Sequence, residues 1–299
     1  MTNWKNYNES LVRRGEILLD FSVIDNWDTE LEKMNKDKEG RKFVYPDSFI
    51  KLLGYIRAYF HLPYRQTEGV VREHASNTLP SIPDYSNISK RINRLDIKIN
   101  DDEDKSSLHT DNFVIAIDST GIKVSNRGEW IRHKWNVKRG YLKIHVAVDI
   151  KRKRVLSLHV TSEEVHDGKI LPELVDDITI KNNKIINTTI MDGAYDSNRI
   201  FQLLSFKGIK PAIKVRKNSR CRKTNHYLRN KAVKMQKNNV EEWKKDSVRY
   251  GQRWIVETVF SCIKRMFGEY VTAIKFENMV KEMILKASLY NLFQRITVK

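Results

Sequence analysis

Four polar residues in the last fifty of the chain have a spacing suited to chemistry on a charged substrate: Tyr250, Arg253, Glu257 and Lys264. On an α-helix their side chains share an arc of roughly 60°. The opposite side of that helix is apolar and consists of Ile255, Val259, Cys262, Ile263 and Met266. A carboxylate among a phenol, a guanidinium and an ammonium group can hold a metal ion beside phosphates, because the acid binds the cation and the bases bind the anion. The spacing therefore predicts phosphodiester chemistry.

Two aspartates follow segments that predict strands. Asp118 follows Phe113–Ile117, and Asp192 follows Ile185–Met191. A strand end holds a side chain rigidly at the edge of a sheet, where active sites of mixed α/β folds commonly lie. With Glu257 the aspartates would supply three carboxylates, enough for two Mg²⁺ or Mn²⁺ ions about 3.5–4 Å apart around one phosphate. Either aspartate alone is more often a turn or cap residue.

The composition indicates a polyanionic partner. The chain has 299 residues and a formal net charge of +18, from 55 Lys and Arg against 37 Asp and Glu. Nucleic acid is favoured over a membrane, because the apolar runs are too short to span a bilayer. The N-terminus lacks the apolar core of a secretory signal, so we expect a cytoplasmic, nucleoid-associated protein. Cys221 and Cys262 form no C-x-x-C pair, so no zinc site is expected.

Residues 1–100 predict an all-helical, DNA-binding region. Apolar spacing after Pro46 and after Pro63 predicts two helices, and Asp84 or Ser86 could cap a third. The third helix would turn Ile88, Ile92 and Leu95 inward and Lys90, Arg91, Asn93 and Arg94 outward. This arrangement resembles helix-turn-helix DNA-binding proteins. An ordinary helical bundle with a solvated charged face is the alternative.

A different fold is expected after an acidic, aperiodic linker at residues 101–110. In residues 111–299, three segments predict strands of the antiparallel type, and alternating helices and strands follow. The expected strands cover residues 113–117 with 121–124, then 141–150, 154–161, 185–192 and 209–215, and the expected helices between them cover 168–178 and 197–206. This order resembles the ribonuclease H fold, an α/β architecture with a mixed five-stranded sheet and flanking helices.

A basic segment at residues 214–248 interrupts this domain before the final helices. Its first part includes Lys214, Lys217 and Lys223, which we expect to contact DNA phosphates. Tyr227 and Trp243 lie between basic residues, where aromatic rings could stack on bases. A disordered, solvated loop is the alternative interpretation.

Three motifs together resemble the DDE transposases of prokaryotic insertion sequences. They are Ile117-Asp118-Ser119-Thr120, Met191-Asp192-Gly193-Ala194-Tyr195-Asp196 and Tyr250-x-x-Arg253-x-x-x-Glu257-x-x-x-x-x-x-Lys264. The last spacing is the signature of the group that includes insertion-sequence families four and five. Near the N-terminus, Trp4-x-x-Tyr7-Asn8-x-x-Leu11-Val12-x-Arg14-Gly15 and Leu62-Pro63-Tyr64-Arg65-Gln66-Thr67-Glu68-Gly69 are similar to family five.

The resemblance implies a DNA transposase that binds terminal inverted repeats, cuts the 3′ end with Mg²⁺ and joins that end to target DNA. It implies metal binding by Asp118, Asp192 and Glu257, and phosphate contacts by Tyr250, Arg253 and Lys264. We expect a homodimer on DNA, because two ends must be joined. The interval from Asp192 to Glu257 is too short for the large inserted β domain of some relatives. A nuclease without strand transfer and an inactive DNA-binding protein are the alternatives.

Overall fold

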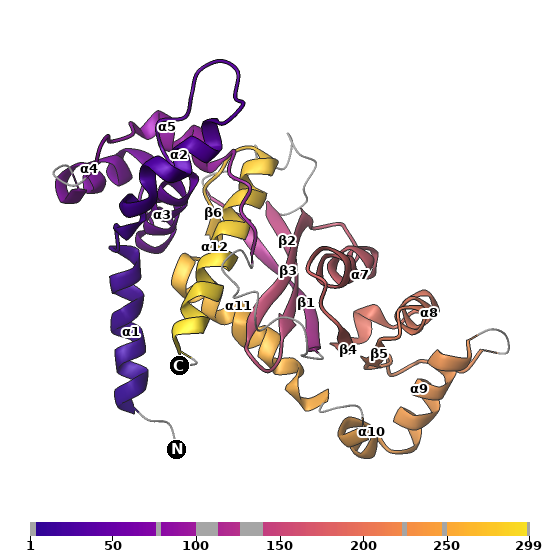
Figure 1. Ribbon diagram of the computed structural model, residues 1–299. Helices are drawn as coiled ribbons and strands as arrows, with labels where there is room; N and C mark the ends of the chain where they lie inside the picture. Colours follow the sequence, from indigo (N-terminus) through magenta and orange to yellow (C-terminus); the bar gives the residue numbers. More distant parts are fainter. Residues whose placement is uncertain are drawn as a thin grey trace. The chain divides into compact units, whose positions relative to one another are not determined.

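The computed structural model describes residues 4–75, 79–99, 113–125, 140–222, 226–246 and 250–297. The chain divides into two compact units (Figure 1): residues 1–101 with 273–299, and residues 102–272. The linker expected at residues 101–110 lies outside the described residues. Residues 273–299, which we expected to belong to the catalytic domain, group with the N-terminal residues.

The first unit is helical in its described residues. Its helices are α1 (Trp4–Leu18), the 3₁₀ turn η1 (Ser22–Asn26), α2 (Trp27–Asn35), α3 (Asp47–Phe60), α4 (Tyr64–Ala75), α5 (Tyr85–Ile92) and α12 (Phe276–Thr297). A Cβ added to Gly54 on α3 would lie 3.0 Å from Leu285 Cδ2 on α12, so glycine permits the close approach of these two helices. The hydroxyls of Tyr55 and Ser288 lie 2.8 Å apart in the same contact.

The third expected helix, α5, is capped by Asp84, whose carboxylate accepts a hydrogen bond of 2.8 Å from the Asn87 N–H. Lys90 and Arg94 are exposed as expected. The prediction that Arg91 faces solvent is wrong. Its guanidinium is buried and donates to Asp47 Oδ1 at 2.6 Å and to the Tyr45 carbonyl at 2.9 Å. Arg91 therefore holds the start of α3 against α5.

The second unit is built on a mixed sheet of β1 (Phe113–Val124), β2 (Tyr141–Asp149), β3 (Arg154–Ser162), β4 (Ile186–Met191), β5 (Lys210–Ile213) and β6 (Tyr270–Val271). The strand order is β3-β2-β1-β4-β5, and β6 pairs with β1. β2 lies antiparallel to β1 and β3, whereas β4, β5 and β6 run parallel to their neighbours. The sheet therefore has one strand more than the five that the sequence predicts. The additional strand is β6, which has two residues.

β1 differs from the prediction that Asp118 ends a strand. The strand continues from Asp118 through Gly121 to Val124, because these residues keep their pairing with β2, for example Ile122 with Leu142. The two short apolar runs in the sequence are therefore one strand of 12 residues.

Helices cover both faces of the sheet (Figure 1). The connecting elements are α7 (Asp167–Asp176), the π-helical turn η3 (Asp177–Lys181), the 3₁₀ turn η4 (Gly193–Tyr195), α8 (Asn198–Phe206), α9 (Tyr227–Asn238), α10 (Val240–Asp246), the 3₁₀ turn η5 (Tyr250–Arg253) and α11 (Trp254–Phe267). α7 and α11 lie on opposite sides of the sheet.

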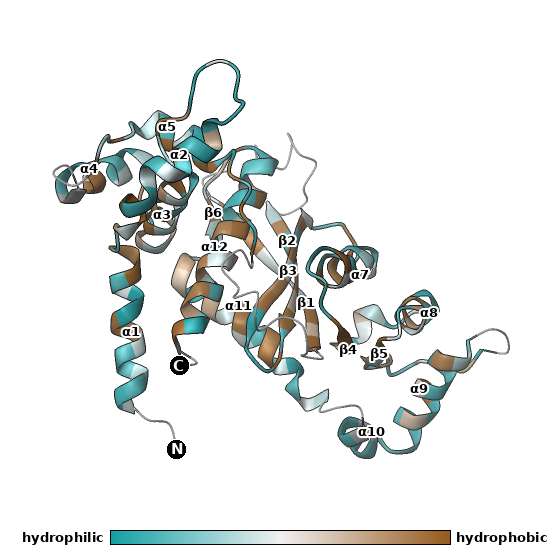
Figure 2. Ribbon diagram, viewed as in Figure 1, coloured by the Kyte–Doolittle hydropathy of each residue, from teal (hydrophilic) through white to brown (hydrophobic). Residues whose placement is uncertain are grey.

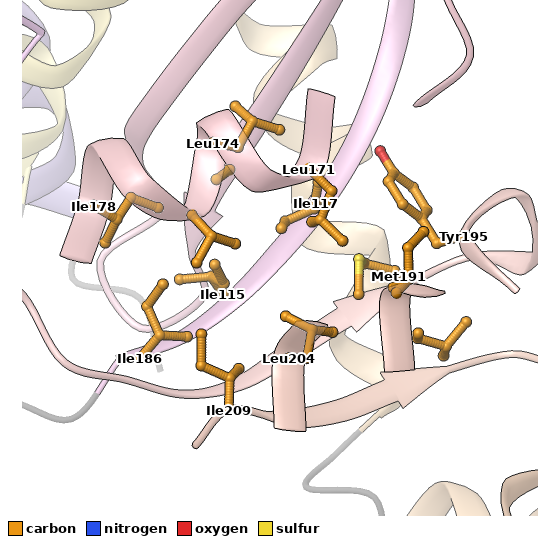
Figure 3. Close-up of a cluster of buried hydrophobic side chains, with 14 of the residues drawn as sticks. Ile115, Ile117, Leu171, Leu174, Ile178, Ile186, Met191, Tyr195, Leu204 and Ile209 are labelled. Atoms are coloured by element: carbon orange, nitrogen blue, oxygen red, sulfur yellow. The ribbon is translucent and has the colours of Figure 1, made fainter. Parts of the chain in front are cut away.

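The core on the α7 side consists of apolar side chains from β1, β4, α7 and α8, including Ile115, Ile117, Leu171 and Leu204 (Figure 3). Hydrophobic stretches on β1, β2 and β3 are visible in brown in Figure 2. Near-continuous apolar stretches of this kind are typical of strands that are covered on both faces. Among the described residues, no helix has the length and apolar character needed to cross a membrane.

Candidate active site

The parallel pairing of β1 and β4 brings two of the predicted acids together. Ala116 on β1 pairs with Ile190 on β4, and Asp118 and Asp192 lie two residues further along each chain. Adjacent strands are about 4.8 Å apart, so Asp118, within β1, and Asp192, directly after β4, are neighbours. Each is oriented by a backbone amide: Ser119 N–H donates to Asp118 Oδ1 and Ala194 N–H donates to Asp192 Oδ1, both at 2.8 Å.

Arg253 connects Asp118 with the third predicted acid. One guanidinium nitrogen, Nη1, donates to Asp118 Oδ2 at 2.9 Å, and Nη2 donates to Glu257 Oε1. Arg253 is the last residue of η5, and Glu257 lies in the first turn of α11. The planar guanidinium can bind two carboxylates at once, which a lysine ammonium group on its single stem does less well. The start of α11 is thereby fixed against the end of the acidic strand pair.

Negative charge accumulates around Asp118. Burial raises the pKa of its carboxyl above the ordinary value, and the nearby carboxylates of Asp192 and Glu257 raise it further. The Ser119 amide and the Arg253 guanidinium act in the opposite direction without cancelling the rise. The ionised site is therefore one that a cation would stabilise.

The sequence spacing predicts that Tyr250 and Glu257 share one helix face. The structure does not show this arrangement. Tyr250 lies in the 3₁₀ turn η5, and its buried hydroxyl donates to the Met191 carbonyl at 3.2 Å. Burial raises the pKa of Tyr250 to about 12, so the phenol is a neutral donor at physiological pH. Its contact with the residue before Asp192 supports the end of β4.

The prediction that Trp243 is available to stack on bases is also wrong. Trp243 on α10 is 5% exposed, and its ring centroid lies 4.7 Å from that of Tyr250. Tyr227 on α9, in contrast, is 76% exposed. Only Tyr227 of the two aromatic residues has a ring that faces solvent.

A pocket of about 570 Å³ opens beside these acids. It is lined by Asp118, Ser119, Thr120, Glu257, Phe260, Ser261, Lys264, Arg265 and Glu269. Lys264 and Arg265 lie in the last turn of α11, where basic side chains also face the negative end of the helix dipole. The lining combines the carboxylates of Asp118, Glu257 and Glu269 with the basic side chains of Lys264 and Arg265, a mixture that suits a phosphodiester together with a cation.

The basic segment is folded, contrary to the alternative of a disordered loop, and its described part contains α9 and α10. Lys214 and Lys217 are exposed, while Lys223 lies outside the described residues. Asp196 ties the segment to the turn after Asp192. Its carboxylate accepts from Arg229 Nε at 2.7 Å and from Ser219 Oγ at 2.7 Å.

Asp196 does not cap the following helix, because the N-cap of α8 is Ser197. The Arg216 side chain adds a further hydrogen bond of 3.1 Å to the Gly193 carbonyl. Neither Arg229 nor Ser219 carried a sequence signal, because their partner lies more than twenty residues away in the chain.

The donor chemistry at the site fits a hard divalent cation. Asp118, Asp192 and Glu257 offer carboxylate oxygens, the ligands that Mg²⁺ and Mn²⁺ prefer. Burial and, after it, the charges of Asp192 and Glu257 raise the pKa of Asp118. Within the described ranges, no three Asp, Glu, His or Cys side chains are gathered closely enough to form a ready-made metal site. The acids fit the ion chemically, and Arg253 occupies two of them.

A mixed sheet with carboxylates side by side on neighbouring strands, bordered by basic side chains, is typical of nucleotidyl-transfer enzymes. Two family models, each described as a transposase DDE domain, match residues 110–292 and residues 12–127. The chain belongs to the transposase DDE domain family. DDE transposases generally use divalent metal ions.

Two solved complexes are similar to this chain at low identity. The piggyBac transposase synaptic complex with hairpin DNA has a TM-score of 0.43 at 11% identity and covers 96% of this chain and 74% of that one. The simian T-cell lymphotropic virus intasome, in complex with the PP2A regulatory subunit B56 gamma, has a TM-score of 0.28 at 13% identity. It covers 68% of this chain and 65% of that one.

Proposed function

We propose that this protein is an active transposase of a prokaryotic insertion sequence, from the group of families four and five and closest to family five. It binds the terminal inverted repeats of its element, cuts at the 3′ end and transfers that end into target DNA. The observation that carries the proposal is that Arg253 bridges Asp118 and Glu257, while Asp192 is the neighbour of Asp118 on the adjacent strand. The strand order of the sheet supports a ribonuclease H-like catalytic domain.

In this proposal Asp118, Asp192 and Glu257 hold two Mg²⁺ or Mn²⁺ ions. Such ions, when bound, supply an activated hydroxyl group and stabilise the leaving oxygen of a phosphodiester. Arg253 orients two of the carboxylates and lies where it can also bind a phosphate. Tyr250 acts by holding the end of β4 through the Met191 carbonyl. Its burial makes direct phosphate contact a lesser part of its role.

DNA contacts in this proposal come from basic residues of both units. In the catalytic unit these are Lys264, Lys214 and Lys217, with Lys223 next in the same basic segment. In the helical unit they are Lys90 and Arg94, whereas Arg91 is occupied by Asp47. The net charge of +18 supports binding of a polyanion. The protein would act as a homodimer that pairs two element ends, on nucleoid DNA in the prokaryotic cytoplasm.

The test is cleavage of an end-labelled duplex that carries the DNA flanking the gene for this chain, with Mg²⁺ present. Wild type should cut at the boundary of the element, and Asp118→Ala, Asp192→Ala and Glu257→Ala should bind the duplex without cutting it. Glu269→Ala is the matched control, because Glu269 is an acid of the same pocket outside the triad. Normal cutting by any of the three triad variants would show that the acids are assigned wrongly.

A second incubation separates transposition from simple cleavage. A pre-cut duplex with a free 3′ hydroxyl is mixed with a supercoiled plasmid, and joined products are measured. Because one metal site serves both in-line transfers, the triad variants should lose cutting and joining together. Cutting without joined products would favour a ribonuclease H-like nuclease. Binding without either reaction would favour an inactive DNA-binding protein.

A further inference from the structure

A group of polar side chains lies on the α7 side of the sheet, behind the strand that carries Asp118. Asp167 is the first residue of α7. Its Oδ1 atom lies 2.8 Å from Lys143 Nζ and 3.3 Å from His145 Nδ1. Ser119 on β1 pairs with His145 on β2, which places it beside this group, and a hydrogen bond with the Ser119 side chain is among the causes that lower the pKa of Asp167. We call Ser119, Lys143, His145 and Asp167 the α7 network.

The α7 network holds an ionised carboxylate in a largely buried place. Burial alone would raise the pKa of Asp167, but hydrogen bonds from His145, Lys143 and Ser119 outweigh it and lower the pKa well below the ordinary range. The Asp167 side chain is 15% exposed and the His145 side chain is fully buried. A buried charge is costly unless it is paired, and the ion pairs of Asp167 with Lys143 and His145 offset that cost.

Ser119 connects the α7 network to the candidate active site. Successive residues of a strand point to opposite faces, so Asp118 and Ser119 project to opposite sides of β1. The Ser119 side chain acts on the Asp167 carboxylate on one side, and the Ser119 backbone N–H donates to Asp118 Oδ1 at 2.8 Å. The orientation of this amide therefore depends on what holds the Ser119 side chain.

Tyr195 lies near the same acids. Its side chain is fully buried beside the apolar core, with the hydroxyl at the edge of the cluster drawn in Figure 3. Within the described residues this hydroxyl has no hydrogen-bond partner. Burial, followed by the carboxylates of Asp167, Asp118 and Asp192, raises its pKa well above the ordinary value. The carboxylates of Asp167, Asp118 and Asp192 thus all act on the same phenol.

We infer that Asp167 is a positioning residue that fixes the carboxylate of Asp118 through Ser119, and so sets the affinity of the site for its divalent cation. The inference rests on the proposed function for the identity of that cation site. Groups that orient metal-binding carboxylates are held in turn by their own hydrogen bonds, and removing such an outer partner typically costs about 10- to 100-fold in metal affinity or activity.

A purely structural role is the rival explanation, since Asp167 also attaches the start of α7 to the sheet. The chain contains a matched control at the other end of that helix. Asp177 accepts from Ser157 Oγ at 2.8 Å and lies 2.7 Å from His159 Nε2. His159 pairs with His145 across β2 and β3, so the two clusters share residue types and a face of the sheet. The partners of Asp177 are Ser157, His159 and Lys181, and none of them touches the candidate active site.

The experiment compares Asp167→Asn with Asp177→Asn in the full-length protein. Mn²⁺ binding is measured without DNA, from the loss of the electron paramagnetic resonance signal of free Mn²⁺. The values of kcat and KM are measured for cleavage of the end-labelled duplex. Asp167→Asn should weaken Mn²⁺ binding and lower kcat, each by roughly 10- to 100-fold, with KM for DNA unchanged. Asp177→Asn should lose similar thermal stability and keep both values.

A double-mutant cycle tests the route through Ser119. Ser119→Ala should reproduce the defect of Asp167→Asn, and the double variant should be no worse than either single variant, because the two residues act in series. Ser157→Ala combined with Asp167→Asn should instead give independent effects. Ser119→Thr keeps the hydroxyl on a residue that strands favour, and it should restore Mn²⁺ binding.

Equal Mn²⁺ affinity in wild type and Asp167→Asn would overturn the inference, as would additive effects of Ser119→Ala and Asp167→Asn. If wild type binds Mn²⁺ but cuts no DNA, the proposed transposase activity fails, while the Mn²⁺ measurements still decide the role of Asp167. A wild-type chain that neither binds Mn²⁺ nor cuts DNA would overturn both proposals.

Discussion

Asp118 is held in an environment that disfavours its own charge. Burial and the carboxylates of Asp192 and Glu257 raise its pKa, and the hydrogen bonds from Ser119 and Arg253 only partly offset that rise. Functional sites commonly store free energy in this way, because a bound ion or substrate recovers it. The ion-free protein should therefore be less stable than a neutral variant of the same shape.

We predict that Asp118→Asn raises the melting temperature in EDTA at pH 7 and abolishes cleavage. Because the folded-state pKa is raised, the ionised group destabilises the fold above that pKa and has no such effect below the unfolded value of 3.8. The gain should therefore shrink as the pH falls towards 4. Thermal unfolding at several pH values measures it.

Asp177→Asn is the control of opposite sign. Burial acts to raise the pKa of Asp177, but its hydrogen bonds with Lys181, His159 and Ser157 lower it. Its charge thus stabilises the fold at pH 7, and that contribution is lost as the pH falls through the lowered pKa.

A lower melting temperature for Asp118→Asn at pH 7 would show that Arg253 stabilises the charge more than burial destabilises it.

The residues of the candidate site could be found from the sequence more readily than their environments. Asp118, Asp192 and Glu257 stand out because residue type, expected strand ends and motif spacing agree. The burial of Arg91 could not be found, because its partner Asp47 is 44 residues away. His145 is a polar residue of β2 that is nevertheless fully buried, and α7 supplies Asp167 as its partner.

The connection between α9 and the turn after Asp192 depends on one buried ion pair. Arg229 and Asp196 have side chains that are 12% and 0% exposed. We predict that Arg229→Gln destabilises the catalytic unit by about 3–5 kcal/mol, because it leaves a buried carboxylate without its charged partner. Urea unfolding measures the change. Lys244→Gln on α10 is the control, since Lys244 pairs with Glu241 in solvent and its loss should have no measurable effect.

The exposed lysines at the start of the basic segment should determine how DNA affinity responds to salt. Replacing Lys214, Lys217 and Lys223 by Gln should flatten the plot of log affinity against log salt by about 0.9 for each duplex phosphate that the variant no longer neutralises. Lys207→Gln is the control, because Lys207 is paired with Asp176. An unchanged slope in the triple variant would remove this segment from the interface.

Element boundaries were predictable where apolar periodicity was long and failed where pairing decided them. α7, α8 and β3 lie close to their expected ranges. β6 could not be expected from two residues, Tyr270 and Val271, whose strand conformation depends on pairing with β1. The residue spacing at Tyr250–Arg253 fits the first turn of an α-helix, but the structure has a 3₁₀ turn there. This turn buries the Tyr250 side chain.

At the scale of the whole molecule, α12 belongs with helices that lie some two hundred residues earlier in the chain. Leu285 is buried against Gly54, and the ring centroids of Tyr59 and Phe293 lie 5.5 Å apart. We predict that Leu285→Ala destabilises the helical unit by about 2–5 kcal/mol. Hydrogen exchange should locate the loss in α3 and α12, with β1 and β4 unaffected. Faster exchange in β1 would mean that the two units unfold as one.

This arrangement also determines the order in which the chain can fold during its synthesis. Residues 102–272 separate the two parts of the helical unit, and ribosomes take roughly 10 to 30 seconds to translate them at about 5–20 residues per second. The unit of residues 102–272 is therefore synthesised completely while the helical unit still lacks α12. Nascent protein interrupted before residue 273 would carry all three acids of the triad but an incomplete helical unit.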